Sequence, residues 1–208
     1  MVKINLASGP SGLDNWINYD WGLLAFLSKF PFLTKIIVKL KLLDSGYLQK
    51  WPPIKLWNLK WPLPLKNRTV DFIYCSHFLE HLDYWQSIRI LQQSHRLLKK
   101  GGIIRLVLPD IDKIIKNYQL TRNIHLLDRR IFGFDQKKLK INFVDQIKKK
   151  FIRPHQQLFN PTKIKKMLKI TGFSNIRQLD YRQGQCPDLN KLDIAVHRHH
   201  SLYFEAST

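Results

Sequence analysis

The hydrophobic and polar positions along the chain show two patterns in turn, one typical of strands and one typical of helices. Short runs of β-branched and aromatic residues are typical of buried strands. We expect such strands at residues 3–6, 16–19, 54–59, 70–75, 103–108, 174–179 and 202–206. Between several of them, apolar residues recur at helical spacing. The order of strand, helix, glycine turn and strand over residues 70–110 predicts a βαβ unit.

Two of the predicted helices have clear start signals. Asp83 is a plausible N-cap, and the pair Gly101 and Gly102 would allow that helix to stop in a left-handed turn. Asn160 can cap a later helix, because Pro161 suits its first position. These signals place the polar residues between the helices in loops.

Two further regions are predicted to be helical. Residues 21–50 look like two amphipathic pieces separated near Pro31, which would form a cap or lid, and residues 111–153 are strongly basic. We find no repeat or linker, so the sequence predicts a single domain over residues 1–208. Lysines interrupt the hydrophobic segment 21–43, which argues against a membrane span. Its alternating aromatic residues and lysines are also typical of an interfacial helix, so peripheral contact with a membrane stays open.

Composition adds a strong charge to this picture. The 208 residues have a net charge of +20 and a pI of about 10.1. Such a charge favours acidic partners, including nucleic acid, anionic lipid, acidic glycans and phosphorylated substrates, unless it only reflects a lysine-rich composition. Cys75 and Cys186 form no disulfide framework, and no signal peptide is visible. We therefore expect a cytoplasmic protein, with peripheral binding at the inner membrane face as an option. The sequence does not predict an oligomeric state.

Polar residues follow both strands of the βαβ unit. Ser76 and His77 end the first strand, and Asp110 follows the second. Because open α/β sheets bind ligands at the carboxyl ends of their strands, we expect Ser76 and His77 near a functional site. Asp110 has two interpretations, as the N-cap of the next helix or as a contact to substrate.

The segment His77-Phe-Leu-Glu-His81 matches the H-x-x-E-H pattern of inverted zinc peptidases. That motif needs a helix and a third ligand, whereas this one directly follows a strand. We therefore expect no metal and leave zinc peptidase chemistry as a remote alternative. The favoured interpretation places His77 in the active site, with Glu80 and His81 bracing the loop.

The other histidines are less clearly placed. His155 lies in a polar stretch and is either a surface residue or a contact or base for a substrate. His197, His199 and His200 precede the last strand and are interpreted as surface or hairpin residues. His95 falls on the apolar face of a predicted helix and is interpreted as a core residue.

Five segments, in order, resemble a known family. They are INLASGPSG with WINYD, LWNLKWPLPL, DFIYCSHFLEHL, LLKKGGIIRLVLPD and the final SLYFEA. Together they are similar to the class I S-adenosylmethionine-dependent methyltransferases of the small bacterial type. The resemblance implies an α/β fold with a doubly wound, mostly parallel Rossmann-like sheet and a helical cap insertion. The link from Leu6 to Trp16 is short for a parallel crossover, so the first helix of that fold would be absent or reduced to a turn.

The resemblance also implies a site for S-adenosylmethionine. It would comprise Ala7, Ser8, Gly9, Asp20, Asn58, Leu59, Ser76 and His77. Small residues would let the backbone approach the cofactor, and the Asp20 carboxylate would accept hydrogen bonds from both ribose hydroxyls. Asn58 and Leu59 would lie beside the adenine. Two positions depart from the family pattern, since Ala7 replaces a glycine and Asn58 replaces a residue that is commonly acidic.

These expectations lead to methyl transfer onto a small-molecule or glycan-type acceptor, which can be acidic. If that acceptor is protonated, the candidate catalytic residues are His77, His155 and Asp110. RNA methylation and a non-catalytic basic protein that binds nucleic acid are the alternatives. Nucleic acid is not favoured, because the sequence has neither an N-P-P-[YF]-like motif nor a recognised RNA-binding module.

Overall fold

The computed structural model describes residues 1–40, 42–43, 48–133 and 154–208, and their strands form one sheet. In spatial order the strands are β3 (Ile54–Leu56), β2 (Ile17–Asp20), β1 (Lys3–Leu6), β4 (Val70–Ser76), β5 (Leu98–Pro109), β7 (Ser201–Ser207) and β6 (Ser174–Leu179). Strands β1 to β5 pair in parallel, and β7 is antiparallel to both of its neighbours. The predicted mostly parallel, doubly wound sheet is confirmed.

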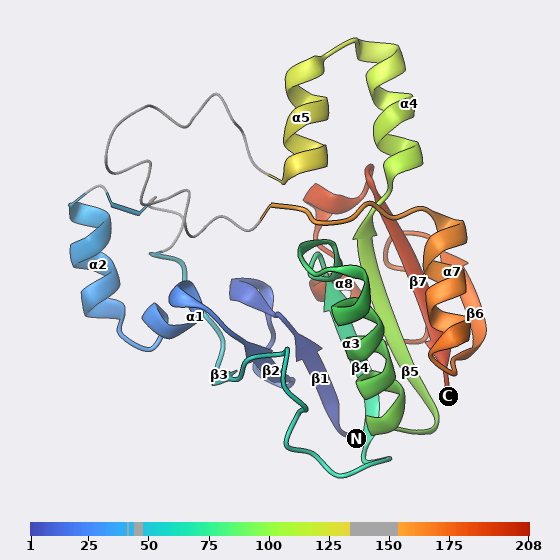
Figure 1. Ribbon diagram of the computed structural model, residues 1–208. Coiled ribbons are helices and arrows are strands. Elements are labelled where there is room, and N and C mark those ends of the chain that lie inside the picture. The colour runs from blue at the N-terminus through green and yellow to red at the C-terminus, as the bar shows by residue number, and fades with distance from the viewer. Residues whose placement is uncertain (41, 44–47, 134–153) are drawn as a thin grey trace.

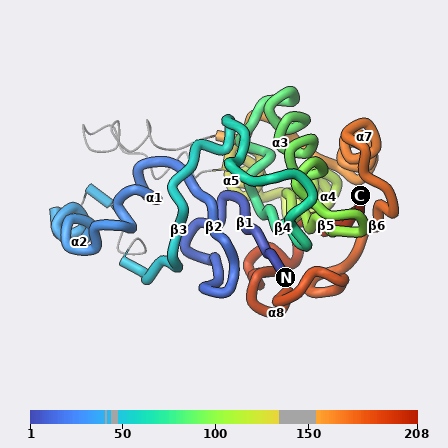
Figure 2. The backbone as a smooth tube through the Cα atoms, turned by 90° about the horizontal axis from the view of Figure 1, so that it is seen from below, coloured from blue at the N-terminus to red at the C-terminus, as the bar shows by residue number. Residues whose placement is uncertain are grey.

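Helices cover both faces of this sheet. Helices α3 (Tyr84–Leu97) and α7 (Pro161–Ile170) lie on one face, and α8 (Leu189–Leu192) lies on the other (Figure 2). The larger hydrophobic core lies under α3 and α7, and a smaller one lies under α8. Helices α4 (Ile111–Thr121) and α5 (Ile124–Phe132) extend past the carboxyl end of β5 (Figure 1). The carboxyl edge of the sheet is therefore partly covered.

The predicted helix starts are confirmed. The Asp83 side chain accepts a hydrogen bond from the Gln86 amide at 2.8 Å, and Asn160 accepts one from the Lys163 amide at 2.9 Å. The predicted stop at the glycine pair is wrong, because α3 ends at Leu97 and β5 begins at once. Gly101 lies inside β5 and has a φ of +76°. Its left-handed backbone falls where the pairing of β5 with β4 is irregular, not at the end of a helix.

The other helical regions follow the predicted outline in part. Helix α1 (Leu23–Leu27) lies beside β3, and α2 (Pro31–Lys39) lies further from the sheet (Figure 1). The two helices divide next to Pro31, as expected. No helix in the described ranges is both long and apolar enough to span a membrane. Helices α4 and α5 account for the first part of the basic region 111–153, and residues 134–153 lie outside the described ones.

The short link between β1 and β2 contains no full helix. A single 3₁₀ turn, Gly9–Ser11, stands in its place, as the sequence predicted. The amide of Ser8 donates to the carbonyl of Tyr19 at 3.3 Å, so the link returns directly to β2. This leaves the carboxyl ends of β1 and β2 close together.

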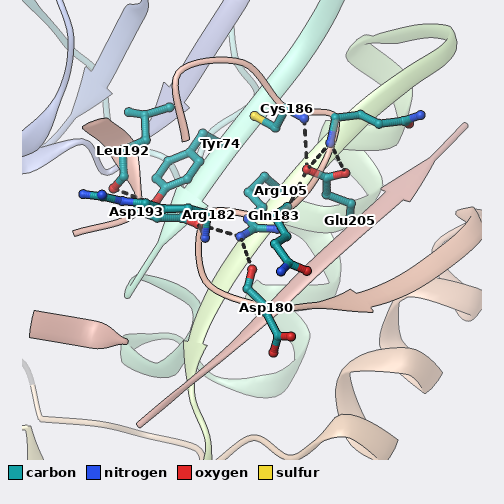
Figure 3. A network of polar contacts seen from close by, with 10 residues as sticks. Tyr74, Arg105, Asp180, Arg182, Gln183, Cys186, Leu192, Asp193 and Glu205 are labelled. Atoms are coloured by element: carbon teal, nitrogen blue, oxygen red, sulfur yellow. Dashed lines mark hydrogen bonds and ion pairs between the residues drawn. The ribbon is translucent and has the colours of Figure 1, made fainter. Parts of the chain in front are cut away.

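A buried arginine holds the segment after β6 against the sheet. Arg105, in the middle of β5, is fully buried and forms an ion pair with Asp193 (Figure 3). Its guanidinium also donates to the carbonyl oxygens of Gln183, at 2.7 Å, and Asp180, at 3.3 Å. On the same side, Glu205 of β7 lies 3.8 Å from Arg105 Nη1. No local pattern of residues indicates this network.

Candidate functional site

A cavity of about 290 Å³ opens at the carboxyl ends of β1, β2 and β4. Five predicted site residues line it, namely Ala7, Asp20, Asn58, Leu59 and His77, together with Trp21, Lys60, Phe78, His81 and Leu82. This is the edge at which open α/β sheets bind ligands. These further lining residues were not predicted from the sequence as part of the site. Each of them lies within a few residues of a predicted site residue.

The carboxylate of Asp20 is held at this cavity by two main-chain hydrogen bonds. Its Oδ2 accepts from the amide of Gly9 at 2.7 Å, and its Oδ1 accepts from the amide of Trp21 at 2.6 Å. Both bonds orient the carboxylate and tie the β1–β2 link to the end of β2. A carboxylate oxygen accepts more than one hydrogen bond, so the same group can also receive two neighbouring hydroxyls of a ligand.

The loop after β1 has an unusual backbone. Ala7 and Gly9 both have a φ of +54°, in the left-handed region. Glycine adopts this conformation freely, whereas an L-residue there costs roughly 1–2 kcal/mol. Ala7 therefore has a backbone conformation that favours glycine, at the position where the resemblance expects a glycine. The predicted residues Ser8 and Gly9 do not line the cavity, but through main-chain bonds they hold Ala7 and Asp20 in place.

Asn58 and Leu59 lie in a turn just after β3, which is shorter than predicted. The Asn58 side-chain oxygen accepts from the Lys60 amide at 3.1 Å, and its main-chain carbonyl accepts from the Trp61 amide at 2.9 Å. Leu59 is buried. The turn thus presents a polar, an apolar and a cationic side chain to the cavity.

His77 has a left-handed backbone, with a φ of +50°, and its amide donates to the carbonyl of Val107 at 2.9 Å. Its Nε2 forms a hydrogen bond with Ser201 Oγ at 3.0 Å, and its ring stacks on that of His197 at a centroid distance of 3.7 Å. Burial lowers the pKa of His77 to about 3, so the imidazole is neutral at pH 7. Ser76 does not line the cavity.

The turn after His77 is bonded to a distant segment. The amide of Gln156 donates to the carbonyl of Glu80 at 2.7 Å, and Gln157 Nε2 donates to the carbonyl of Leu82 at 2.9 Å. These bonds bring His155 against His81, with ring centroids 4.9 Å apart. His81 lines the cavity, whereas His155 is not among the residues that line it. Burial raises the pKa of Glu80 to about 7 and lowers that of His155.

Asp110 takes the first of its two predicted interpretations. Its side chain caps α4 by accepting from the Asp112 amide at 3.1 Å, and its carboxylate is buried. Burial raises its pKa. Asp110 does not line the cavity, so its contact with a substrate stays a prediction.

Two histidines assigned to the surface are part of the site region. His197 and His200 are half-buried, and only His199 is exposed. His200 Nε2 lies 2.6 Å from Arg130 Nη1, and burial lowers the pKa of both His197 and His200 to about 3. The surface assignment is therefore wrong for these two. Their place depends on β7 pairing beside β5, which no local pattern reveals.

Comparisons with known proteins agree on one family. A family model described as a methyltransferase domain matches residues 41–178. No curated protein is significantly similar to the chain in sequence.

The fold is shared with solved structures at low sequence identity. A methyltransferase dependent on S-adenosylmethionine from Methanosarcina mazei has a TM-score of 0.54 and 17% identity over 99% of this chain and 91% of its own. One from Thermotoga maritima, titled a possible histamine N-methyltransferase, has a TM-score of 0.53 and 12% identity, over 99% and 81%. One from Archaeoglobus fulgidus has a TM-score of 0.52 and 13% identity, over 99% and 85%.

Proposed function

Because the chain belongs to the methyltransferase-domain family and is an enzyme that uses S-adenosylmethionine, we propose that it methylates a small-molecule or glycan-type acceptor. The cavity at the carboxyl edge of the sheet is the observation that carries this proposal. Its volume of about 290 Å³ suits a cofactor portion and a small group better than a folded macromolecule.

The residues around the cavity fit the cofactor. The Asp20 carboxylate would accept from the two ribose hydroxyls, for which its fixed orientation and two oxygens are suited. Asn58 and Leu59 would contact the adenine, one by hydrogen bonding and one by packing. The left-handed backbone at Ala7 would pass close to the methionine portion. When bound, S-adenosylmethionine supplies a sulfonium methyl group that an acceptor atom can attack in line, with the neutral thioether of the cofactor as the leaving group.

The protein has mainly to orient the acceptor. Holding two reactants in line can contribute about 7–11 kcal/mol to lowering a barrier. His77, Phe78 and His81 form the wall of the cavity after β4, where the acceptor would lie. If the acceptor is a hydroxyl, His77 would take its proton, because it lines the cavity and His155 does not. For His77 this requires Nε2 to exchange its hydrogen bond with Ser201 for one with the acceptor.

The alternatives have less support. The charge of +20 would serve RNA methylation or the binding of nucleic acid equally well, but charge alone does not distinguish a substrate from a counter-ion. A zinc peptidase needs its H-x-x-E-H residues on a continuous helix, whereas His77 has a left-handed backbone and only a 3₁₀ turn, Leu79–His81, follows it.

An acceptor screen tests the proposal. With methyl-labelled cofactor, label is expected to pass to at least one member of a panel of sugars, nucleotide sugars and phenols, because a cavity of this size admits such groups. Transfer should be measured by mass spectrometry in parallel with a panel of RNA molecules. Labelling of RNA alone, persisting at physiological salt, would contradict the proposal and favour the nucleic-acid alternative.

The α1–α2 segment supports a finer proposal about location. It exposes an unusual set of large apolar side chains, namely Trp21, Leu23, Phe26, Phe30, Phe32, Leu33, Ile36 and Leu40. Lys35 and Lys39 are exposed on the same helix as Phe32. Aromatic residues next to lysines are suited to the surface of an anionic bilayer. We infer that this segment makes peripheral contact with such a surface.

Binding to vesicles tests this contact. The protein is expected to sediment with vesicles that contain anionic phospholipid and to stay in solution with zwitterionic ones. Phe32→Ser should weaken the binding roughly tenfold, because a phenyl ring that enters the interface contributes more than 1 kcal/mol. Trp85→Ser is the matched control, since Trp85 is 69% exposed on α3, away from this segment. Equal losses in both variants, or no loss in either, would contradict the assignment.

A further inference from the structure

Glu80, His81 and His155 place three potential ligand atoms within 4.8 Å of one another. Glu80 and His81 come from the 3₁₀ turn after β4, and His155 comes from the segment bonded to that turn. The hydrogen bond from the Gln156 amide to the Glu80 carbonyl fixes the two pieces of chain together. The cluster is therefore built by the fold and does not depend on exposed, mobile side chains.

Several polar atoms of this cluster lack partners. The side chain of Glu80 is 1% exposed, and its Oε2 has no hydrogen-bond partner in the part of the chain that the structure describes. The same holds for His81 Nδ1 and His155 Nδ1. Buried polar atoms are nearly always hydrogen-bonded, and a buried carboxylate is costly without a compensating charge. His77 Nδ1 lies 3.0 Å from Glu80 Oε1, so an imidazole already contacts one of the two carboxylate oxygens.

A cation would satisfy the Glu80 carboxylate and one nitrogen of each imidazole at once. One carboxylate and two imidazole nitrogens form a ligand set that proteins use for Zn²⁺ and Fe²⁺, with positions left open for water or substrate. We propose that Glu80, His81 and His155 bind one divalent transition-metal ion beside the cavity. This differs from the expectation of no metal drawn from the sequence, where His77 and His81 were considered together as the zinc ligands of an H-x-x-E-H motif.

A second group of histidines does not offer an equivalent site. His77, His197 and His200 also lie within ligand distance of one another. However, the guanidinium of Arg130 lies 2.6 Å from His200 Nε2, and its positive charge would repel a metal ion. The rings of His77 and His197 are stacked, and His77 Nε2 is bonded to Ser201. This group therefore supplies a control for the proposed one.

The position of the cluster suggests a use. Since His81 also lines the cavity, a metal ion there would lie at the cavity wall and could bind an oxygen of the acceptor. His77, next to the Glu80 carboxylate, would help to orient that ligand. This use rests on the proposed methyl transfer, whereas the metal site itself does not.

Metal binding can be measured without cofactor or acceptor, so its failure is separate from failure of the proposed function. The protein, without a histidine tag, is treated with chelator and titrated with Zn²⁺ by calorimetry and with Co²⁺ by visible spectroscopy. We expect one ion per chain, a Co²⁺ spectrum of low coordination number and a rise in melting temperature with Zn²⁺. No binding at millimolar metal would overturn the proposal.

Variants locate the site. Glu80→Gln and His155→Asn should each weaken Zn²⁺ binding at least tenfold, while His197→Asn, the matched control, should leave it unchanged. In the metal-free protein, Glu80→Gln should melt close to wild type, because it keeps the size of the side chain and removes a buried charge. Binding that survives both ligand variants, or that is lost equally in His197→Asn, would overturn the assignment. His155→Asn keeps the test decisive if Glu80→Gln does not fold.

Discussion

Asp20→Ala is expected to weaken the binding of S-adenosylmethionine by about ten- to hundredfold. Hydrogen bonds to a charged group contribute roughly 1.5–3 kcal/mol, and the variant would remove the proposed acceptor of the ribose hydroxyls. The two amides that now donate to Asp20, those of Gly9 and Trp21, would also lose their acceptor. The dissociation constant from calorimetric titration measures the effect, with the demethylated product as a second ligand.

Two further variants make this test specific. Asp20→Asn keeps the size of the side chain and should bind with intermediate affinity, because an amide has only one acceptor oxygen. Asp14→Ala removes a carboxylate of the same β1–β2 link that is exposed and does not line the cavity, so it should bind like wild type. Unchanged affinity in Asp20→Ala would exclude Asp20 from the cofactor site.

Arg105→Met is expected to lower the free energy of unfolding by about 3–5 kcal/mol, the usual cost of removing one partner of a buried ion pair. The variant would leave two buried carboxylates, those of Asp193 and Glu205, without their central cation. It would also remove the donor to the carbonyl oxygens of Asp180 and Gln183. The segment that α8 belongs to would then lose its main polar attachment to β5.

Urea denaturation followed by circular dichroism gives this free energy by linear extrapolation. Arg89→Met is the control, since Arg89 is exposed on α3 and its removal should change stability by no more than about 0.5 kcal/mol. Arg105→Lys should fall between the two, because an ammonium keeps the charge but loses the planar fork of donors. A loss below about 1 kcal/mol in Arg105→Met would contradict the importance of the network.

The features that the sequence predicted correctly are local ones. A buried strand and a capped helix depend on neighbouring residues, which is why the strands and the caps at Asp83 and Asn160 could be read directly. The cavity position of Asp20 was implied by the family resemblance, which itself rests on short local segments. Gly101 was misread because a left-handed glycine ends a helix and shapes a strand irregularity equally well, and only pairing with β4 distinguishes the two.

The features that the sequence did not predict depend on distant pairing. His77 and Ser201 are far apart in the chain, and they meet because β7 follows β6 and then inserts beside β5. The same insertion turns His197 and His200 from apparent surface residues into neighbours of the site. The partners of Arg105 lie after β6 and in β7, so no local pattern points to its ion pairs.

The antiparallel strand β7 links the formation of the site to the completion of the sheet. Its first residue, Ser201, bonds to His77, and Glu205 near its other end accepts from the amides of Gln185 and Cys186. Because β7 lies between β5 and β6, local separation of this strand would unpair both neighbours. It would break the hydrogen bonds of Ser201 and those of Glu205 together. Such a strand is expected to open only with the whole domain and not as a separate unit. The free energy needed to open the cavity wall is therefore expected to equal that of unfolding the whole protein. Hydrogen exchange of the β7 amides would measure it.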